Sequence, residues 1–573
     1  MKEETKGKQK GKTSISRRNV IKGLGVTAAA SVVPLAACSN LQGTPEWSAT
    51  FDWITVGSRV AGLCAAMRGH DLGMKTLLLE HANQVSDIAN YLTGSAGFMP
   101  MNHLQKAKGW EDSRERGVKY LLHVGGGYAK QEYAEAYVDN AGRVVEYLAT
   151  KADIPYSFPG DDGVPVDYGF YDEDVPGGAA KGRSVRSKPF PSEALGTWRD
   201  KVWPGAYYRG FRGGDSPFRT AEKQLAAWRK VLGPEKFEAV VSQNQATWPG
   251  NAGWVAYLFR AVINRGIEVR LETEVEKLIT ENGRVVGVAV NQNGKRENLR
   301  ANKGVVLAMG NKYRGYRCDW GEGWRLAAEV EGKVGSIANQ VVARCTIAVP
   351  EEIWPNGKHV GRTLGSTPHN LIVNWHGERF DDETYYAGVA RVVNHFDDRP
   401  YHRFRNFPNY LIFDQQLLEK YSFAGMPPGH TEPGDWEWLT QGSTLAELAQ
   451  KLKIEAKPLQ ATVARFNEFA RRGKDADFSR EARSLGTVEK PPFYGLQTNT
   501  PDPFETVTEV VIDTHSQVLH YKTDQPIPGL YSAGRQASMS RVWGVGYQGG
   551  FLSGSEQIFG FLAAEHAAAA TRA

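Results

Sequence analysis

The chain has 573 residues, of which 41% are hydrophobic and 23% are charged, and its net charge is +5. This length permits two or more domains with a large buried core, and the composition is that of a globular protein. Residues 1–22 carry eight basic residues against two acidic ones, which leaves a net charge of −1 on the rest of the chain. A nucleic-acid-binding function therefore has no electrostatic support.

The N-terminal 38 residues resemble an export signal. Residues 16–22, Ser-Arg-Arg-Asn-Val-Ile-Lys, resemble the twin-arginine motif, with valine where phenylalanine is commoner. The Ala- and Gly-rich run over residues 23–37 is too short and too weakly apolar for a permanent membrane anchor. It ends in Leu-Ala-Ala-Cys38, which resembles a lipoprotein cleavage box and predicts an exported protein that is lipid-anchored at Cys38 in the cell envelope. An ordinary Ala-x-Ala cleavage with an incidental cysteine is the alternative.

A dinucleotide-binding pattern occupies residues 51–80, after a polar linker. It reads as an apolar strand, a turn at Gly57, a helix containing Gly62, and a second strand that ends in Glu80. Gly57 allows the sharp turn, Gly62 lets the helix pack against the strand, and the helix N-terminus offers N–H groups to a diphosphate. Glu80 lies where an acid accepts hydrogen bonds from a ribose 2′-hydroxyl. The one departure is Arg59, which occupies the second fingerprint position, where glycine lets the backbone approach the phosphates.

Apolar spacing predicts the further elements in chain order. Helices are expected over residues 130–152, 254–264, 445–452, 459–471 and 552–570. Strands are expected over residues 267–271, 304–310, 410–414 and 526–534, a strand and turn over residues 374–380, and a hairpin over residues 275–290 with its turn at 281–283. Residues 155–220 are rich in Gly, Pro and aromatic residues and predict little regular structure.

The change of pattern near residue 345 predicts an inserted domain. Residues 345–500 read as a separate α+β domain, whereas the buried-strand-plus-glycine style of the first domain returns after residue 500. The predicted division is a signal over residues 1–38, a linker over 39–50, a dinucleotide-binding domain over 51–344 and 501–573, and the insertion between them. No internal repeat is visible.

The cysteines predict neither a cluster nor a haem attachment site. The chain has four, Cys38, Cys64, Cys318 and Cys345, and no Cys-x-x-Cys. Cys64 lies in the fingerprint helix and is expected to be a small core residue. A disulfide between Cys318 and Cys345 is compatible with an exported protein, but spacing does not establish it. The 13 histidines show no metal-ligand spacing.

Short motifs follow one another in a fixed order over about residues 51–565. They are Val56-Gly-Ser-Arg-Val-Ala-Gly-Leu63, Val166-Asp-Tyr168, Pro176-Gly-Gly178, Gly182-Arg-Ser184, Val305-Val-Leu-Ala-Met-Gly310, Gly321-Glu-Gly323, Gly377-Glu-Arg-Phe380, Thr462-Val-Ala-Arg-Phe466, Pro491-Pro-Phe-Tyr494 and Gly529-Leu-Tyr-Ser-Ala-Gly534. In this order they resemble the flavoprotein family that contains the 3-ketosteroid dehydrogenases and, more distantly, the soluble fumarate reductases.

The resemblance implies FAD as cofactor, and an α/β fold in which a Rossmann-like FAD-binding domain, made of two sequence segments, holds an inserted α+β catalytic (capping) domain. It implies FAD contacts from Gly57, Ser58, Arg59, Ala61, Gly62, Glu80, Gly94, Ser95, Val275, Ala308, Gly310, Gly534, Phe551 and Leu552. Three departures lie on this cofactor side: Arg59, Ser86-Asp87 in place of a Gly-Gly pair, and Asn311 in place of a glycine. Because a guanidinium suits phosphate geometry, Arg59 is a candidate for a direct phosphate contact.

The resemblance also implies how the carbonyl group of a substrate is held. The family moves a hydride between the flavin N5 and a carbon β to a carbonyl, while a proton moves at the α carbon. Tyr547 matches the tyrosine that, with a glycine N–H, holds the ketone oxygen as enolate character develops. The spacing after Tyr547 makes Gly550 that glycine, with Gly549 as the alternative.

Two further positions match the groups that move the proton. Tyr386, or its neighbour Tyr385, matches the acid/base, which is tyrosine in the ketosteroid dehydrogenases and arginine in the fumarate reductases. Tyr168 matches a tyrosine that hydrogen-bonds the acid/base and helps to lower its pKa, which is needed because free tyrosine is a poor base at neutral pH. Tyrosines in place of arginines favour a neutral, bulky, apolar ketone over a small dianion.

The sequence therefore predicts an exported FAD-dependent oxidoreductase that acts on the carbon–carbon bond next to a ketone, with a steroid-like ketone or enone as the substrate class. Since no haem motif is present, it needs a separate electron carrier, either a membrane quinone route or a cytochrome. One alternative is a reductase of a small unsaturated acid, for which Arg391, Arg403 or Arg541 would supply cationic contacts. Another is a non-catalytic relative that has lost FAD through Arg59.

Overall fold

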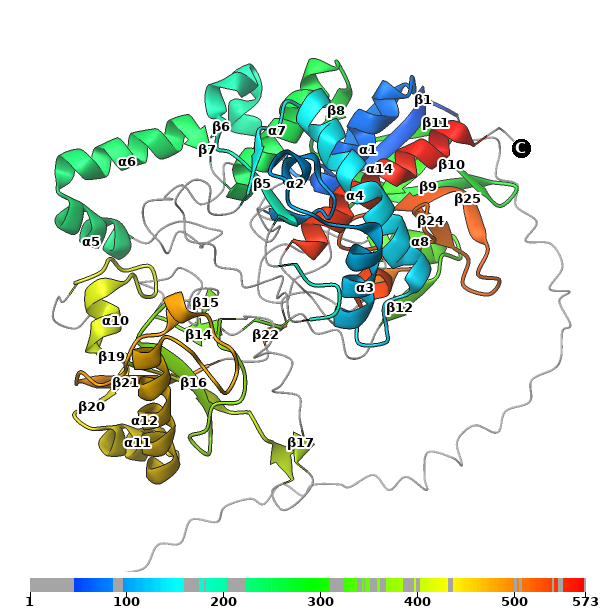
Figure 1. Cartoon of the computed structure of the whole chain (residues 1–573). Coiled ribbons are helices and arrows are strands. Elements are labelled where there is room, and N and C mark those ends of the chain that lie inside the picture. Colours follow the sequence, from blue (N-terminus) through cyan, green and yellow to red (C-terminus); the bar gives the residue numbers. More distant parts are fainter. Residues whose placement is uncertain are drawn as a thin grey trace, which may run out of the picture. The chain divides into compact units, whose positions relative to one another are not determined.

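Figure 1 shows the computed structural model of the chain. The structure describes residues 46–85, 96–158, 175–179, 182–202, 222–248, 250–309, 323–336, 343–344, 346–350, 358–360, 367–384, 396–397, 402–430, 436–498, 502–503, 508–537, 540–544 and 550–570. All elements described below belong to one compact unit, Trp47–Ala573.

The centre of the first domain is an eight-stranded sheet with a parallel core. Its strands follow the order β24 (Gln517–Leu519), β25 (Pro526–Ser532), β11 (Lys295–Leu307), β1 (Ala49–Val56), β2 (Thr76–Leu79) and β8 (Glu268–Arg270), and β9 and β10 extend it beside β11. From β25 to β8 neighbouring strands are parallel, which explains their continuous apolar runs: every residue of β2 is buried. Strands from both ends of the chain thus share one sheet, so the Rossmann-like domain is built from two sequence segments.

The predicted hairpin is confirmed. β9 (Thr273–Glu281) and β10 (Arg284–Gln292) pair antiparallel across a turn at Asn282 and Gly283, which both have positive φ. This is the conformation that favours Asn-Gly in two-residue hairpin turns. A second turn of the same kind, at Asn293 and Gly294, leads into β11, which is longer than the strand expected at residues 304–310.

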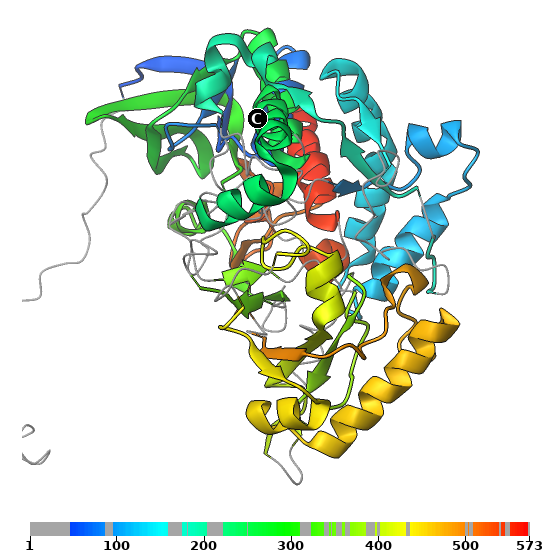
Figure 2. The same ribbon diagram turned by 90° about the vertical axis from the view of Figure 1, so that its left-hand side faces the viewer.

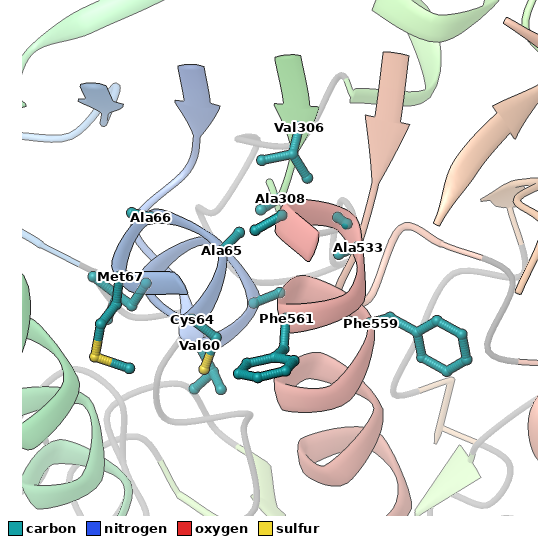
Figure 3. Close-up of a cluster of buried hydrophobic side chains, with 14 of the residues drawn as sticks. Val60, Cys64, Ala65, Ala66, Met67, Val306, Ala308, Ala533, Phe559 and Phe561 are labelled. Atoms are coloured by element: carbon teal, nitrogen blue, oxygen red, sulfur yellow. The ribbon is translucent and has the colours of Figure 1, made fainter. Parts of the chain in front are cut away.

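Helices α1 (Val60–Asp71) and α14 (Phe551–Ala569) lie side by side against the sheet (Figure 3). They approach closely because Gly560 faces the Ala61 backbone, where a Cβ would overlap the Ala61 carbonyl oxygen. Most of α14 is buried, as expected of a helix that is apolar on nearly all sides. The predicted terminal helix is therefore confirmed, and α7 (Gly250–Asn264) and α4 (Gln131–Lys151) confirm two further ones.

The inserted domain is an α+β unit around a four-stranded antiparallel sheet. Its strand order is β16 (Asn370–Asn374), β19 (Asn409–Asp414), β21 (Phe493–Gln497) and β20 (Thr440–Gly442). The predicted helices are confirmed as α11 (Leu445–Leu452) and α12 (Ala456–Arg472), which pack their apolar faces on this sheet (Figures 1 and 2).

Two expectations about regular structure have different outcomes. The turn of the strand-and-turn pattern expected over residues 374–380 is confirmed: β16 ends at Asn374, and the Asn374 side chain accepts hydrogen bonds from the N–H groups of His376 and Glu378 and closes the turn. Within the described part of residues 155–220, Ser192–Lys201 form a 3₁₀ helix with a kink at Gly196 where little regular structure was expected.

Short strand pairs connect the two segments of the first domain where the insertion begins and ends. β13 (Ala343–Arg344) pairs with β22 (Asp502–Pro503), and β12 (Val334–Ser336) pairs with β23 (Thr508–Val510). The chain thus runs antiparallel to itself where it enters and leaves the insertion. These pairs flank the boundaries expected at residues 345 and 500, which themselves stay a prediction.

The remaining elements connect and cover the two domains. They are β3 (Ala96–Phe98), α2 (His103–Ala107), α3 (Arg114–Val124), β4 (Tyr156–Ser157), β5 (Ser184–Ser187), β6 (Phe190–Pro191), α5 (Glu222–Leu232), α6 (Pro234–Ala246), β7 (Thr247–Trp248), α8 (Gly323–Glu329), β14 (Thr346–Ala348), β15 (Lys358–Val360), β17 (Phe396–Asp397), β18 (Arg403–Phe404), α10 (Gln415–Lys420), the 3₁₀ turn Ala482–Ser484, and α13 (Ser540–Trp543). In the described residues, none of the helices is both long and apolar enough to span a bilayer.

Candidate cofactor and active site

The predicted cofactor residues gather at one edge of the parallel sheet. Val56 at the end of β1 is in register with Leu79 at the end of β2 and with Leu307 at the end of β11, which is in register with Ser532 at the end of β25. The residues that follow these four strand ends are the turn at 57–59, Glu80, Ala308 and Gly534. This carboxyl edge is where open α/β sheets bind their ligands.

The turn between β1 and α1 leaves no room for side chains at its two glycines. Gly57 has a φ of 103°, and a Cβ on it would lie 2.7 Å from the Ala308 carbonyl oxygen. A Cβ on Gly62 would overlap the Gly57 carbonyl oxygen and lie 3.3 Å from the Ala308 Cβ. Gly534 has a φ of 83°, and a Cβ on it would lie 3.2 Å from the Ala61 Cβ. The geometric reasons given for Gly57 and Gly62 from the sequence are those that the structure shows.

Glu80 is held in place without using its full accepting capacity. Its Oε2 accepts hydrogen bonds from the Ser58 N–H, at 2.9 Å, and from the Ser58 hydroxyl, and its Oε1 accepts one from the Ala82 N–H at 2.9 Å. A carboxylate has about four acceptor positions, so a ribose hydroxyl can still donate to it. The predicted role of Glu80 toward the ribose therefore fits its surroundings.

A polar cavity of about 560 Å³ adjoins Glu80. Its lining residues are His81, Ala82, Asn83, Glu272, Glu274, Asn291, Asn293 and Gly294. Val275, another predicted cofactor residue, directly follows Glu274 in β9, where its buried side chain pairs across the hairpin with Val290. The cavity is thus lined by sequence neighbours of two predicted cofactor residues, Glu80 and Val275, and by neither of those residues itself.

Two helix N-termini reach the site without a capping side chain. No side chain caps α1 at Arg59 or α14 at Gly550, and neither helix has an acid in its first turn. Their first N–H groups lack partners within the helix and carry the positive end of the dipole. Gly550 has a φ of 87°, and its carbonyl oxygen accepts from the N–H groups of Phe98 and Gly554. Phe551 packs edge-on against Phe98, so the side chain belongs to the core and only the backbone is available to a ligand.

Arg59 lies in a buried ion cluster that sequence reasoning missed. The Arg59 Nη2 is 3.7 Å from the Glu556 Oε1, and the Arg535 Nε is 3.6 Å from the same oxygen. All three side chains are almost fully buried, at 6% exposure or less. Nothing local pointed to this cluster except Glu556 itself, a lone acid early in an apolar helix.

Cys64 has the structural role that its sequence context predicts. It is buried between α1 and α14 (Figure 3) and is a free thiol. Burial, and next the negative charge of Glu556, raise the pKa of this thiol, so the thiolate that reacts is disfavoured. The possible Cys318–Cys345 disulfide lies outside the described residues.

A second buried ion network lies in the inserted domain. Arg379 donates to Glu383 from Nε at 2.6 Å and from Nη2 at 2.8 Å, and Arg379 Nη2 also donates to Asp475 at 2.9 Å. Arg480 donates to Glu383 from Nη1 at 3.2 Å. The four side chains are at most 4% exposed. The i,i+4 spacing of Arg379 and Glu383 was the only local signal for this network.

The charges of this network outweigh the cost of burial. Burial by itself would raise the pKa of Glu383, but the positive charge of Arg379, its hydrogen bond and the charge of Arg480 lower that pKa overall. Burial also works against Asp475, whose pKa is nevertheless lowered by the hydrogen bond and charge of Arg379. Both carboxylates therefore stay ionised, and Glu383 holds the chain two residues before Tyr385.

Several predicted residues lie outside the described part of the chain. These are Tyr168, Tyr385, Tyr386 and Tyr547 among the candidate catalytic residues, and Gly94, Ser95 and Gly310 among the cofactor residues. Their roles stay predictions.

The arginines proposed for the acid-reductase alternative have other partners where they are described. Arg541 Nη1 donates to the Tyr133 hydroxyl at 3.2 Å, and the Arg403 guanidinium stacks on Trp375. Arg391 lies outside the described residues. A group of three or more potential metal ligands does not occur in the described ranges.

The sheet, its glycine turn and the acid after the second strand define a dinucleotide-binding protein of the Rossmann-like type. The chain belongs to the FAD binding domain family, whose model matches residues 52–555. FAD is therefore its cofactor. The residues fit this group: Glu80 retains acceptor positions for a ribose hydroxyl, and two uncapped helix N-termini offer N–H groups to a diphosphate.

Two curated relatives resemble the chain along most of its length. The 3-oxosteroid 1-dehydrogenase of Mycobacterium tuberculosis is 29% identical, over 90% of this chain and 98% of that protein. The 4-oxocyclohexanecarboxylate 2-dehydrogenase of Sinomonas cyclohexanicum is 27% identical, over 91% of this chain and 93% of that protein. The crystal structure of a 3-ketosteroid Δ1-dehydrogenase from Sterolibacterium denitrificans, solved with 1,4-androstadiene-3,17-dione, has the same fold, with a TM-score of 0.74 and 24% identity over 91% of this chain and 99% of that one.

Proposed function

We propose that the chain is an FAD-dependent oxidoreductase that acts on the carbon–carbon bond next to a ketone. The proposal is supported by the carboxyl edge of the parallel sheet, where a glycine turn and two uncapped helix N-termini form a site for FAD. It is also supported by the alignment of most of the chain with dehydrogenases of ring ketones. Both relatives' names place the dehydrogenated carbon two positions from the oxo group, which is the β carbon. The β carbon is also where a carbonyl makes hydride transfer feasible, since the negative charge left at the α carbon is delocalised onto the oxygen.

Bound FAD supplies the acceptor or donor of the hydride, and the residues of this chain do the rest. In the direction of dehydrogenation, a hydride leaves the β carbon and a proton leaves the α carbon, so that a carbon–carbon double bond forms. We assign the hold on the ketone oxygen to the Tyr547 hydroxyl and the Gly550 N–H, which stabilise the enolate charge. We assign the proton at the α carbon to Tyr386 or Tyr385, with Tyr168 as hydrogen-bond partner.

A bulky, neutral ring ketone is the proposed substrate class. A site in which tyrosines take the places of arginines has no fixed charge with which to hold a small dianion. Of the arginines proposed for holding a small dianion, Arg541 bonds the Tyr133 hydroxyl and Arg403 stacks on Trp375. A 3-oxosteroid is therefore the first compound to test, and a cyclohexanone is the second.

The visible absorption spectrum of the purified full chain tests the proposal without an electron carrier. We expect flavin bands, anaerobic bleaching of these bands by a 3-oxosteroid, and recovery of the bands of the dithionite-reduced protein on addition of the corresponding enone. If fumarate restores the bands of the reduced protein and the steroid compounds leave the spectrum unchanged, the result would instead support a reductase of small unsaturated acids. Protein that retains no flavin even after incubation with FAD would refute the assignment.

We further propose that the protein is exported by the twin-arginine route and lipid-anchored at Cys38, and that a separate carrier, a quinone route or a cytochrome, exchanges electrons with it. The support is the motif at residues 16–22 and the Leu-Ala-Ala-Cys38 box. Replacing Arg17 and Arg18 by lysine should keep the protein in the cytoplasm, whereas Cys38→Ala should release it from the membrane fraction. Membrane association that survives Cys38→Ala would contradict the lipid anchor.

A further inference from the structure

The backbone at Arg59 does not require glycine. Arg59 has φ −79° and ψ 177°, an extended conformation that any residue adopts, and it precedes the first residue of α1. The preference for glycine at this fingerprint position comes from the space that the diphosphate needs next to the backbone. A side chain at this position is therefore acceptable only if something holds it aside.

Glu556 lies close to the guanidinium of Arg59. It belongs to the second turn of α14 and is fully buried. Its Oε1 is 3.7 Å from Arg59 and 3.6 Å from Arg535, and neither of its oxygens accepts a hydrogen bond from the described part of the chain. An acid in such surroundings is stable only beside positive charge.

The cluster joins three segments that are far apart in sequence. Arg59 belongs to the turn after β1, Arg535 to the turn after β25, and Glu556 to α14. These are the segments that carry the glycine turn, Gly534 and the second uncapped helix N-terminus. One buried carboxylate thus sets the relative positions of the elements that surround the cofactor.

We propose that Glu556 is a positioning residue for the FAD site: it holds the Arg59 guanidinium against α14, so that an arginine occupies the second fingerprint position without obstructing the diphosphate. The rival interpretation is that Arg59 binds the diphosphate directly. The two differ in their consequences. If Glu556 is the partner, the loss of Arg59 removes an obstacle and a buried charge together; if the diphosphate is the partner, the loss of Arg59 removes a cofactor contact.

A double-mutant cycle of Arg59→Gly and Glu556→Gln in the full chain tests the proposal. The first measurement is the thermal unfolding midpoint of the apoprotein. Because Glu556→Gln removes a carboxylate that lies within 4 Å of two buried arginines, we expect it to lower the midpoint by about 3 to 5 °C, and by less than half as much in the Arg59→Gly background. Equal losses in the two backgrounds would refute the pairing.

The second measurement is the dissociation constant of FAD, from quenching of flavin fluorescence. We expect Arg59→Gly to leave it within about threefold of the wild-type value or to lower it, because glycine restores the space at the diphosphate. An increase of about tenfold, which corresponds to about 1.4 kcal/mol, would establish Arg59 as a direct ligand and overturn the proposal.

The chain offers a matched control on the same two helices. Arg68 of α1 and Glu565 of α14 form a partly exposed ion pair at 2.5 Å, more than two turns along α1 from the fingerprint, and Glu565 also pairs with Arg143 at 2.8 Å. Glu565→Gln should therefore show the same small effect with and without Arg59→Gly. If the Glu556→Gln single variant does not fold, the folding of the double variant becomes the test. A double variant that folds supports the proposal, whereas a double variant that does not fold, when Arg59→Gly alone does fold, refutes it. The measurements use no substrate, so they succeed or fail independently of the proposed reaction.

Discussion

Replacing Glu383 by glutamine should destabilise the inserted domain strongly. Glu383 accepts three hydrogen bonds from Arg379 and Arg480, and its side chain is 1% exposed. Together with Asp475 the four charges cancel, so Glu383→Gln leaves one buried positive charge without a counterion. Breaking a buried pair in this way costs about 3–5 kcal/mol.

Differential scanning calorimetry measures the effect. For a domain of the size of the insertion, a loss of this order lowers the unfolding midpoint by roughly 6 to 20 °C. Glu447→Gln is the matched control, because Glu447 forms an exposed i,i+4 pair with Lys451 on α11 of the same domain and should leave the midpoint almost unchanged. A Glu383→Gln protein that unfolds at the wild-type temperature would refute the reasoning, since the buried network would then not stabilise the domain.

Three further predictions concern pH, the glycine turn and catalysis. The folded-state pKa values of Glu383 and Asp475 are lowered, so these two carboxylates stabilise the fold at pH values above their unfolded-state pKa, and this stabilisation is lost as the pH falls through their folded-state pKa values. The free energy of unfolding, measured by urea titration, should therefore fall steeply below about pH 4, and less steeply in Glu383→Gln. Parallel pH profiles of the two proteins would contradict this. Gly62→Ala places a Cβ on the Gly57 carbonyl oxygen, so it should lower the free energy of unfolding by about 3 kcal/mol or more and lower the amount of flavin bound per protein. Full flavin content would show that the turn adapts. Tyr547→Phe should lower kcat about 100- to 1,000-fold with bound FAD retained, because one donor to the ketone oxygen is lost, and a kcat near the wild-type value would remove Tyr547 from the site.

Local patterns in the sequence were sufficient for most of the fold. The glycine turn, the hairpin turn at Asn282-Gly283 and the buried terminal helix follow from conformational preferences and apolar spacing within short windows. The turn expected within residues 374–380 has the same local origin, because the Asn374 side chain ends the strand by bonding two backbone N–H groups.

The sequence predicted the individual residues of the cofactor site, but not the contacts that the Arg59 side chain makes. Register between β1, β2, β11 and β25 brings Gly57, Glu80, Ala308 and Gly534 to one edge, as the order of motifs implied. The sequence marked Arg59 only as a departure from a fingerprint. Its one sign of the carboxylate that accompanies Arg59 was Glu556 itself, an acid early in an apolar helix.

The sequence by itself therefore determined the position of the dinucleotide turn, because that turn depends on residues that are near neighbours in the chain. The order of the motifs along the chain determined the class of fold and the cofactor, through the family resemblance. Only the tertiary structure decided which charges meet in the interior. Arg59 meets Glu556, and Glu383 meets Arg480, across long stretches of chain. A buried charge is stabilised by whatever lies within a few ångströms of it, and that depends on how distant segments pack, which no local pattern of residues records.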